Sequence, residues 1–293
     1  MRSTDSFSSY HPIINFLYFG LVLVFSMFFM DPVCLAVSLT ASLVYLFRLR
    51  GRGKAGRVFR YVIPVMLLAV VINPAFNHRG VTILAYLPSG KPLTLESILY
   101  GLAAAAMLAS VLVWFACFSD VVTSDKFIYL FGRIIPALSL VLSMTLRFVP
   151  RFTAQMRAVS EARRSLCPET SGKLVPRVRS AVAVLSSVVT WSLENSIDTA
   201  DSMRSRGYGL SGRTAYSVYR FDRRDRSALI WLVLCGAITI SGWIAGAFSF
   251  DYYPALGGAA PTALDMSFTL VYLALCLTPV FMDIREDRAW KRS

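Results

Sequence analysis

Long apolar runs restrict this chain to membrane folds more strongly than any other feature of its sequence. A helix needs about twenty apolar residues to cross a bilayer, and five runs are long enough to be crossings. They cover roughly residues 12–30, 60–76, 97–117, 227–247 and 264–282. A shorter run, 33–47, follows Asp31-Pro32 and would pair with the first run as a helical hairpin. The sequence therefore predicts an all-α integral membrane protein with about six membrane-spanning helices.

The balance of residue types supports the same fold class. Of the 293 residues, 56% are hydrophobic and only 16% are charged, which is too little charge for the surface of a soluble domain this large. The five cysteines are scattered and include no C-x-x-C pair. We therefore interpret them as small buried side chains, with no disulfide framework.

Positive charge is concentrated on one side of the predicted membrane helices. Of the 30 Lys and Arg residues, 28 lie in the N-terminal tail, in residues 48–60, in residues 118–226 or in residues 284–293. Only Arg79 and Lys91 lie in the opposite loops. Because short cytoplasmic loops are enriched in Lys and Arg, both termini and the long central segment are predicted to be cytoplasmic. This location of the charge indicates a membrane-associated platform and not a nucleic-acid surface.

The pattern Gly51-x-Gly53-x-x-Gly56 matches a dinucleotide-binding fingerprint, but its context does not fit. That fingerprint needs a preceding strand and an acidic residue about twenty positions later. Here an apolar run precedes the glycines, and Phe76 occupies the later position. We expect a flexible cytoplasmic turn.

The longest connection on the predicted outer side, residues 73–96, is expected to form a small hairpin or cap. Residues 81–87 and 92–95 have strand character and are separated by Pro, Ser, Gly and Lys. His78 lies in this connection without a second His or any Cys nearby, so we interpret it as a surface histidine and not as a metal ligand.

The chain is predicted to divide into N-terminal membrane helices (1–117), a cytoplasmic or interfacial platform (118–226) and C-terminal membrane helices (227–293). The platform contains two apolar stretches, 134–146 and 181–193, each thirteen residues long and too short for an ordinary crossing. The eight Lys and Arg between them oppose exposure on the outer side. We expect both stretches at the inner interface or packed beneath the membrane helices.

Beyond each apolar stretch the pattern predicts an amphipathic helix. In the second helix, Leu185, Val189, Leu193 and Ile197 repeat every four residues on one face, and acids lie on another. Pro168 and Pro176 are expected to separate the two helices, and Gly207 to cap the second. Such a pair could rest on anionic lipid headgroups or dock a protein; the acidic face and the arginines at both helix ends favour docking.

Residues for self-sufficient chemistry or transport are absent from the sequence. The acids Asp31, Glu96, Asp265 and Asp283 lie at the boundaries of the apolar runs, whereas ion-coupled transporters place ionisable groups within the bilayer. The chain has no phosphate-binding G-x-x-x-x-G-K-[ST] motif, and both of its histidines lie near predicted surfaces. No cofactor, metal site or catalytic residue is predicted. Energy for any active transport would have to come from a partner.

Several motifs together resemble the transmembrane T component of energy-coupling factor (ECF) transporters, the EcfT/CbiQ-like family. Leu146-Arg-Phe-Val-Pro150 is similar to the entry into that family's cytoplasmic helices, and Ala200-Asp-Ser-Met-Arg-Ser-Arg-Gly-Tyr208 is similar to its closing signature. His11-Pro12, Asp31-Pro32 and the connection from residue 73 to residue 96 add to the resemblance.

The resemblance implies a non-catalytic scaffold in a bacterial or archaeal plasma membrane. Its partners would be two ABC-type ATPase subunits, a substrate-binding S component for a vitamin or a metal, and the lipid bilayer. The residues implied in ATPase docking are Arg163, Arg164, Ser165, Ser205, Arg206 and Gly207. Arg164 takes the first arginine role, with Arg163 as the alternative register. The apolar bearing surface for the S component would comprise Phe152, Met156, Leu185, Val189 and Leu193.

Two other functions stay open at this level. A membrane-embedded lipid-modifying enzyme would need convergent polar groups near the inner interface, for which Glu161, Glu194, Asp198 and Asp201 are the candidates. The permease of a conventional ABC importer would show one coupling helix and not two helices that end in arginines.

Overall fold

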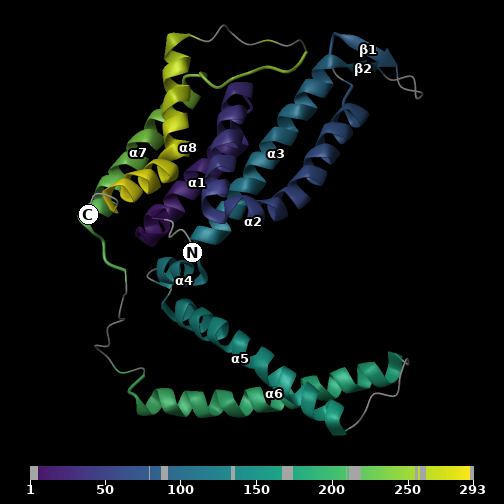
Figure 1. Cartoon of the computed structure of the whole chain (residues 1–293), viewed down its shortest axis with the longest axis vertical. Coiled ribbons are helices and arrows are strands. Elements are labelled where there is room, and N and C mark those ends of the chain that lie inside the picture. The colour runs from purple at the N-terminus through teal and green to yellow at the C-terminus, as the bar shows by residue number, and fades with distance from the viewer. Residues whose placement is uncertain are drawn as a thin grey trace. The chain divides into compact units, whose positions relative to one another are not determined.

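A computed structural model describes residues 6–78, 80–86, 92–132, 136–166, 174–208, 210, 219–254, 257 and 262–290. These residues are predominantly helical, which confirms the predicted fold class. After a short 3-10 helix, Phe7–Ser9, the helices are α1 (Pro12–Phe28), α2 (Pro32–Phe76), α3 (Leu95–Val121), α4 (Ser124–Gly132), α5 (Pro136–Leu166), α6 (Leu174–Ser205), α7 (Arg223–Ile244) and α8 (Ala263–Trp290). Figure 1 labels these elements.

The chain folds as two compact units. One unit, here called the membrane unit, comprises the chain up to Lys126 together with the chain from Tyr219 onward. The other, here called the helix-pair unit, comprises residues 127–218 and contains α5 and α6.

Five helical segments of the membrane unit are long and apolar enough to cross a membrane. They are Pro32–Gly51, Ala55–Phe76, Leu95–Val121, Arg223–Ile244 and Ala263–Glu286. α1 is also apolar but has 17 residues, the lower end of the spanning range. The run at 33–47, marginal in the sequence, lies within a 20-residue segment. The described residues thus contain all six predicted apolar helices.

Side-chain caps set where several of these helices begin. The carboxylate of Asp31 accepts hydrogen bonds from the N–H groups of Val33 (2.8 Å) and Cys34 (3.2 Å), and Pro32 follows it at the first helical position. Both features are typical of a helix N-terminus, where the first N–H groups lack intrahelical partners. Asp31 therefore lies at the boundary of α2, as predicted.

α2 bends at Gly51 into two arms that form separate candidate spans (Figure 1). Gly51 has φ 67° and ψ 164°, which only glycine adopts readily. The backbone is helical on both sides of it, so the expected flexible turn is wrong: the glycine-rich segment is a kinked helix. No strand precedes Gly51 among the described residues, so the context of a dinucleotide-binding fingerprint is also missing.

The core of the membrane unit is aromatic with a small polar centre. Tyr18, Phe19, Tyr45 and Trp114 are fully buried, and their rings contact one another mostly edge to face. Cys34, Cys117, Cys235 and Cys276 are buried, as the sequence predicted, whereas Cys167 lies outside the described residues.

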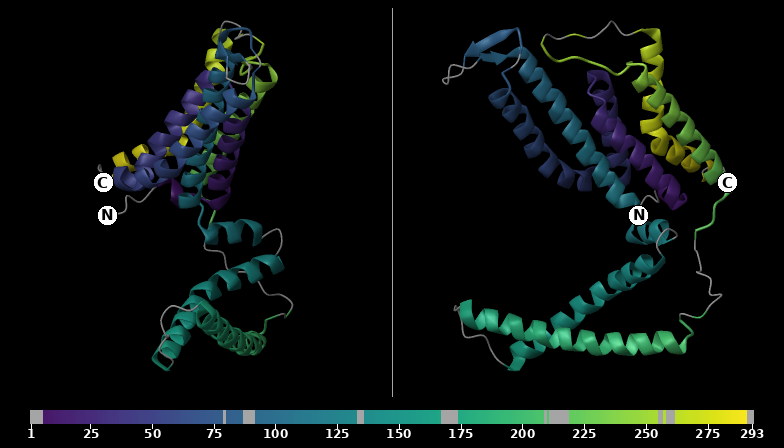
Figure 2. Two further views of the ribbon diagram at one scale, coloured as in Figure 1. Left: turned by 90° about the vertical axis from the view of Figure 1, so that its right-hand side faces the viewer. Right: turned by 180° about the vertical axis from the view of Figure 1, so that it is seen from behind.

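The predicted hairpin is present at the end of the membrane unit where α3 begins (Figure 2). β1 (Ile83–Tyr86) pairs antiparallel with β2 (Pro92–Thr94), and residues 87–91 between them lie outside the described residues. The nearby His78 differs from expectation: both ring nitrogens are buried and have no hydrogen-bond partner among the described residues.

Within the helix-pair unit, each predicted apolar stretch continues directly into its amphipathic segment. α5 has 31 residues and contains Pro150 in its interior, so this proline does not end the helix. α6 has 32 residues and begins at Leu174, two residues before Pro176. The predicted break at Pro176 is therefore wrong, because proline is tolerated in the first helical turn. Pro168 lies outside the described residues.

Candidate partner-docking site

The two long helices of the helix-pair unit cross each other and pack through aromatic and branched side chains (Figures 1 and 2). Val184 and Val188 of α6 are 9% and 6% exposed. The ring of Trp191 meets Phe152 of α5 edge to face, with 5.9 Å between centroids. This contact joins the two helices, so Phe152 belongs to their interface.

A second apolar face of α6 is exposed. Leu185, Val189 and Leu193, three of the predicted bearing residues, are 53%, 49% and 63% exposed. Ile197 continues the same stripe and is 64% exposed. On α5, Met156 is also exposed. Four of the five predicted bearing residues thus lie on exposed apolar surface, whereas Phe152 is half-buried.

The C-terminus of α6 closes in a Schellman motif. Gly207 has φ 74°, the left-handed conformation that favours glycine. Its N–H donates to the carbonyl of Arg204 at 2.9 Å, and the N–H of Tyr208 donates to the carbonyl of Met203 at 3.0 Å. These two bonds satisfy carbonyls that the helix end would otherwise leave unpaired. The predicted cap at Gly207 is confirmed.

This motif fixes the backbone beside the second predicted arginine. Arg206 lies between the last helical residue, Ser205, and Gly207, and both Ser205 and Arg206 are exposed. The Leu210 side chain lies close to Gly207. A Cβ placed on the glycine would lie 3.1 Å from Leu210 Cδ1. A cation at this position also suits the negative end of the helix dipole.

The two adjacent arginines at the end of α5 have different surroundings. Arg163 is half-buried, and its Nε donates to the hydroxyl of Ser180 on α6 at 3.0 Å. Arg164 is exposed and makes no hydrogen bond or ion pair with the described residues. Ser165 is exposed, and its hydroxyl donates to the carbonyl of Glu161 one turn earlier. Of the two arginines, Arg164 is the more exposed.

The acidic residues that were candidates for a lipid-modifying enzyme lie on exposed surface. Glu161, Glu194, Asp198 and Asp201 are all exposed, and none forms an ion pair with another described residue. Within the described ranges, no three His, Cys, Asp or Glu side chains come together in a way that could hold a metal ion.

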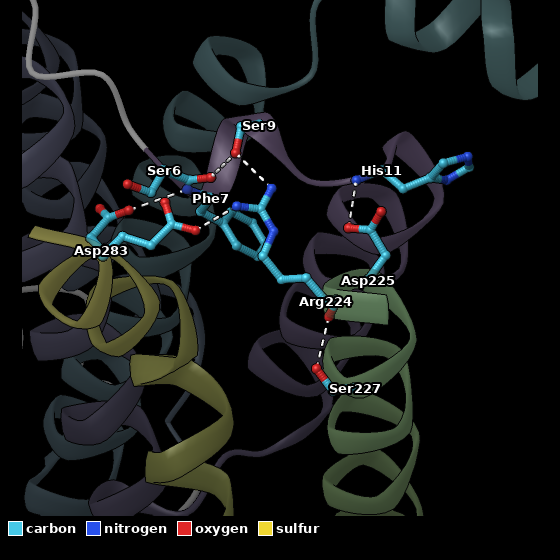
Figure 3. A network of polar contacts seen from close by, with 9 residues as sticks. Ser6, Phe7, Ser9, His11, Arg224, Asp225, Ser227 and Asp283 are labelled. Atoms are coloured by element: carbon cyan, nitrogen blue, oxygen red, sulfur yellow. Dashed lines mark hydrogen bonds and ion pairs between the residues drawn. The ribbon is translucent and has the colours of Figure 1, made fainter. Parts of the chain in front are cut away.

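A polar cluster at one end of the membrane unit was missed by the sequence analysis (Figure 3). His11, expected near a surface, is 5% exposed, and Lys126, Asp225 and Asp283 are 7%, 4% and 7% exposed. Figure 3 shows the N-terminal residues between the first turn of α7 and the last turns of α8. These residues are far apart in sequence, so no local pattern indicated that they belong to one cluster.

His11 caps α1 within this cluster. Its Nδ1 accepts from the N–H of Ile13 at 3.3 Å, and its ring packs against Phe221 with 5.2 Å between centroids. Burial lowers the pKa of His11 below its ordinary value, and the neighbouring Asp225 carboxylate opposes that shift in part. A neutral imidazole suits the cap, because the protonated ring has no acceptor nitrogen.

Arg224 of α7 is exposed and contacts several residues of the cluster from its solvent side. Its guanidinium donates to Glu286 at 2.6 Å and to the hydroxyl of Ser9 at 3.1 Å, and it lies over the Tyr10 ring at 4.2 Å. Burial is the largest of the effects that raise the pKa of Tyr10 above its ordinary value. The arginine therefore joins the beginning of α7, the end of α8 and the N-terminal residues.

The fold is that of a multi-pass membrane protein in which two long helices, α5 and α6, end beside exposed arginines. Comparison with known proteins gives a more specific resemblance. The chain is similar to the energy-coupling factor transporter transmembrane protein EcfT of Lactobacillus helveticus, with 34% identity over 99 residues. Those residues are 33% of this chain and 36% of the relative.

Further relatives carry the same name. Over 107 residues, 36% of this chain and 39% of the relative, it is 30% identical to EcfT of Lacticaseibacillus paracasei. Over 103 residues, 34% and 39% of the two chains, it is 28% identical to EcfT of Bacillus subtilis. The matches thus span less than half of each relative's length. No protein-family model matches the chain. The resemblance to T components is confirmed over about a third of the sequence.

Proposed function

We propose that this chain is the T-component scaffold of an ECF-type ABC importer. In this role it couples ATP hydrolysis by two ATPase subunits to movement of a membrane-embedded S component that binds a vitamin or a metal. The chain itself is non-catalytic in this proposal. Its similarity to proteins named as ECF transporter transmembrane components supports the role.

The end of α6 is the observation that carries the proposal. Arg206 is exposed beside a backbone held in a Schellman motif, so it can enter a partner's groove without first ordering the helix end. A guanidinium presents a rigid fork of donors that suits carboxylates, and Gly207 allows close backbone approach. Arg164 and Ser165 would serve the second ATPase at the end of α5.

The exposed stripe on α6 supports contact with the S component. Leu185, Val189 and Leu193 face away from α5 and need an apolar partner or lipid to remove them from water. Met156 would extend this bearing surface from α5. Two arginine-ended helices, in place of one coupling helix, favour a T component over the permease of a conventional ABC importer.

The proposed topology follows the distribution of charge. Both ends of the chain and the helix-pair unit lie in the cytoplasm, where ATP is available, and the hairpin lies outside. Residues 48–60 belong to the kinked helix α2, and their six Lys and Arg lie on the cytoplasmic side in this topology. A cysteine introduced at Thr82 should react with a membrane-impermeant thiol reagent from outside the cell, and one at Ser202 should not.

Capture of the ATPase pair tests the proposal. The chain is co-expressed with the two ATPases of an ECF transporter and purified in mild detergent, and the retained ATPases are quantified. The Arg164→Glu/Arg206→Ala double variant should keep its membrane insertion and lose most of the ATPases. Arg57→Ala, which removes an exposed arginine of α2, is the matched control. Unchanged capture by the double variant would refute the proposed function.

A further inference from the structure

The N-terminal residues Phe7–His11, here called the N-terminal segment, meet both places where the chain passes between its two units. The chain leaves the membrane unit after Lys126 and returns to it at Tyr219. These two connections are more than ninety residues apart in sequence. Each nevertheless contacts the same short, buried segment, as the following geometry describes.

The first connection is held by a buried lysine. Lys126 donates from Nζ to the carbonyl of Ser8 at 2.6 Å and to the carbonyl of Val121 at 2.9 Å. With the Asn15 amide oriented to satisfy its neighbours, its oxygen lies 2.8 Å from the same Nζ and its nitrogen donates to the Phe7 carbonyl at 3.0 Å. An ammonium has three protons, and they join α3 and α1 to the N-terminal segment.

The second connection is held by a histidine ring and a shared carboxylate. The ring of His11 lies against Tyr219 and Phe221, at 6.4 and 5.2 Å between centroids. One oxygen of Asp225 accepts from the N–H of His11 at 3.3 Å, and the other accepts from the N–H of Asp222 at 3.1 Å. One carboxylate therefore binds the N-terminal segment and the chain that returns to α7.

The N-terminal segment has little room to move independently. Phe7 is fully buried in the aromatic core, where its ring meets Tyr18 at 5.1 Å. Its N–H donates to the Asp283 carboxylate of α8 at 3.2 Å (Figure 3). Breaking contacts to charged groups in such surroundings costs more than breaking exposed ones. The segment is thus fixed to α1, α3, α7 and α8 at once.

From this arrangement we infer that the N-terminal segment is a shared anchor that makes the two connections move as one body. A displacement of the chain at Lys126 shifts Ser8, and the peptide backbone carries that shift within three residues to His11 and so to the returning chain. The anchor assigns a positioning role to residues outside the docking helices. This goes beyond the proposed function and does not depend on it.

Hydrogen–deuterium exchange on the purified chain in detergent tests this coupling without any ATPase present. Lys126→Met removes the ammonium and should raise exchange in residues 219–226 by about tenfold, as loss of a charged hydrogen bond implies. Conversely, His11→Ala should raise exchange in residues 121–128. Each variant is thus measured at the other connection.

A matched control comes from the same end of α3. Asp120→Asn weakens the ion pair with Arg50 on α2 and leaves the N-terminal segment intact, so exchange in 219–226 should stay unchanged. Lys126→Arg, which keeps a cation, should lie between wild type and Lys126→Met. Local loosening confined to 121–128 in Lys126→Met, or a uniform rise along the whole chain, would overturn the shared anchor. Unchanged ATPase capture by Arg164→Glu/Arg206→Ala, with intact coupling between the two connections, would instead count against the proposed function and leave the shared anchor standing.

Discussion

Arg163 Nε donates to the hydroxyl of Ser180 at 3.0 Å, so the first of two adjacent arginines is directed at the neighbouring helix. The second, Arg164, is exposed. We expect Arg164→Ala to weaken ATPase capture by at least about 2 kcal/mol, roughly 30-fold in affinity, because a desolvated charge pair loses one partner. Titration of immobilised protein with the ATPase pair measures this.

The neighbouring variants separate docking from helix pairing. Arg163→Ala and Ser180→Ala remove the same hydrogen bond, and both should chiefly loosen the contact between α5 and α6 with smaller effects on capture. Loss of capture in Arg163→Ala but not in Arg164→Ala, with wild-type behaviour of Ser180→Ala, would assign the docking role to Arg163 instead.

Gly207→Ala should destabilise the end of α6. An L-residue in the left-handed region costs about 1–2 kcal/mol, and the new Cβ would press on Leu210 at 3.1 Å. Faster amide exchange at residues 203–208 and weaker ATPase capture are the expected readouts. Gly207→Asn should be milder, since asparagine tolerates this conformation.

The control for Gly207 is a glycine without either constraint. Gly20 lies within α1, and a Cβ there would meet nothing within 4 Å. Gly20→Ala should therefore leave stability unchanged or slightly higher, because alanine favours helix. Comparable destabilisation by both substitutions would contradict the role assigned to the Schellman motif.

Stability should depend on the protonation of His11. Its pKa is lowered by burial in the folded protein, so below about pH 6.5, the ordinary value for histidine, the unfolded chain binds more protons than the folded one. The stabilisation is present above that pH and is lost as the pH falls toward the folded-state pKa. Thermal unfolding between pH 5 and pH 8 should show the decline.

His11→Asn isolates that contribution. Asparagine can still cap α1 but does not titrate in this range, so the variant should lose less stability than wild type on acidification. Superimposable pH profiles for the two proteins would show that His11 is not the responsible group.

Ser38→Ala should destabilise the core of the membrane unit. The Ser38 hydroxyl accepts from Nε1 of the fully buried Trp114 at 3.1 Å and bonds the Ser26 hydroxyl at 2.9 Å. Without it the indole N–H would lose this partner, at a cost of about 1–2 kcal/mol. Thermal unfolding in detergent, followed by tryptophan fluorescence, measures the loss.

Ser42 provides the comparison one turn later on α2. It is equally buried, but its hydroxyl donates only to the carbonyl of Leu39 in its own helix. Ser42→Ala should therefore have the smaller effect. The opposite ranking would mean that the link between helices contributes little.

Local patterns predicted several features that depend only on neighbouring residues. The apolar runs predicted the six apolar helices, and the turn residues between 81 and 95 predicted the hairpin. The cap at Gly207 followed from a glycine behind an amphipathic repeat. The kink at Gly51 was mistaken for a flexible turn, because the same glycines and arginines also suit a loop.

Local patterns could not predict which apolar face of α6 is buried. Val184 and Val188 repeat at the same spacing as Leu185 and Val189, so the periodicity predicts two apolar faces equally well. Contact with α5 buries the first pair and leaves the second exposed. The same contact turns Phe152 into an interface residue, although its own helix pattern grouped it with Met156.

The sequence by itself determined the helical membrane fold. A backbone in lipid must satisfy its hydrogen bonds internally, and each helical crossing needs about twenty apolar residues. Only the tertiary structure decided that residues 11, 126 and 225 meet around one buried segment, and that Arg163 and Arg164 have different surroundings. Such meetings depend on how helices far apart in sequence pack together, and no local spacing encodes that choice.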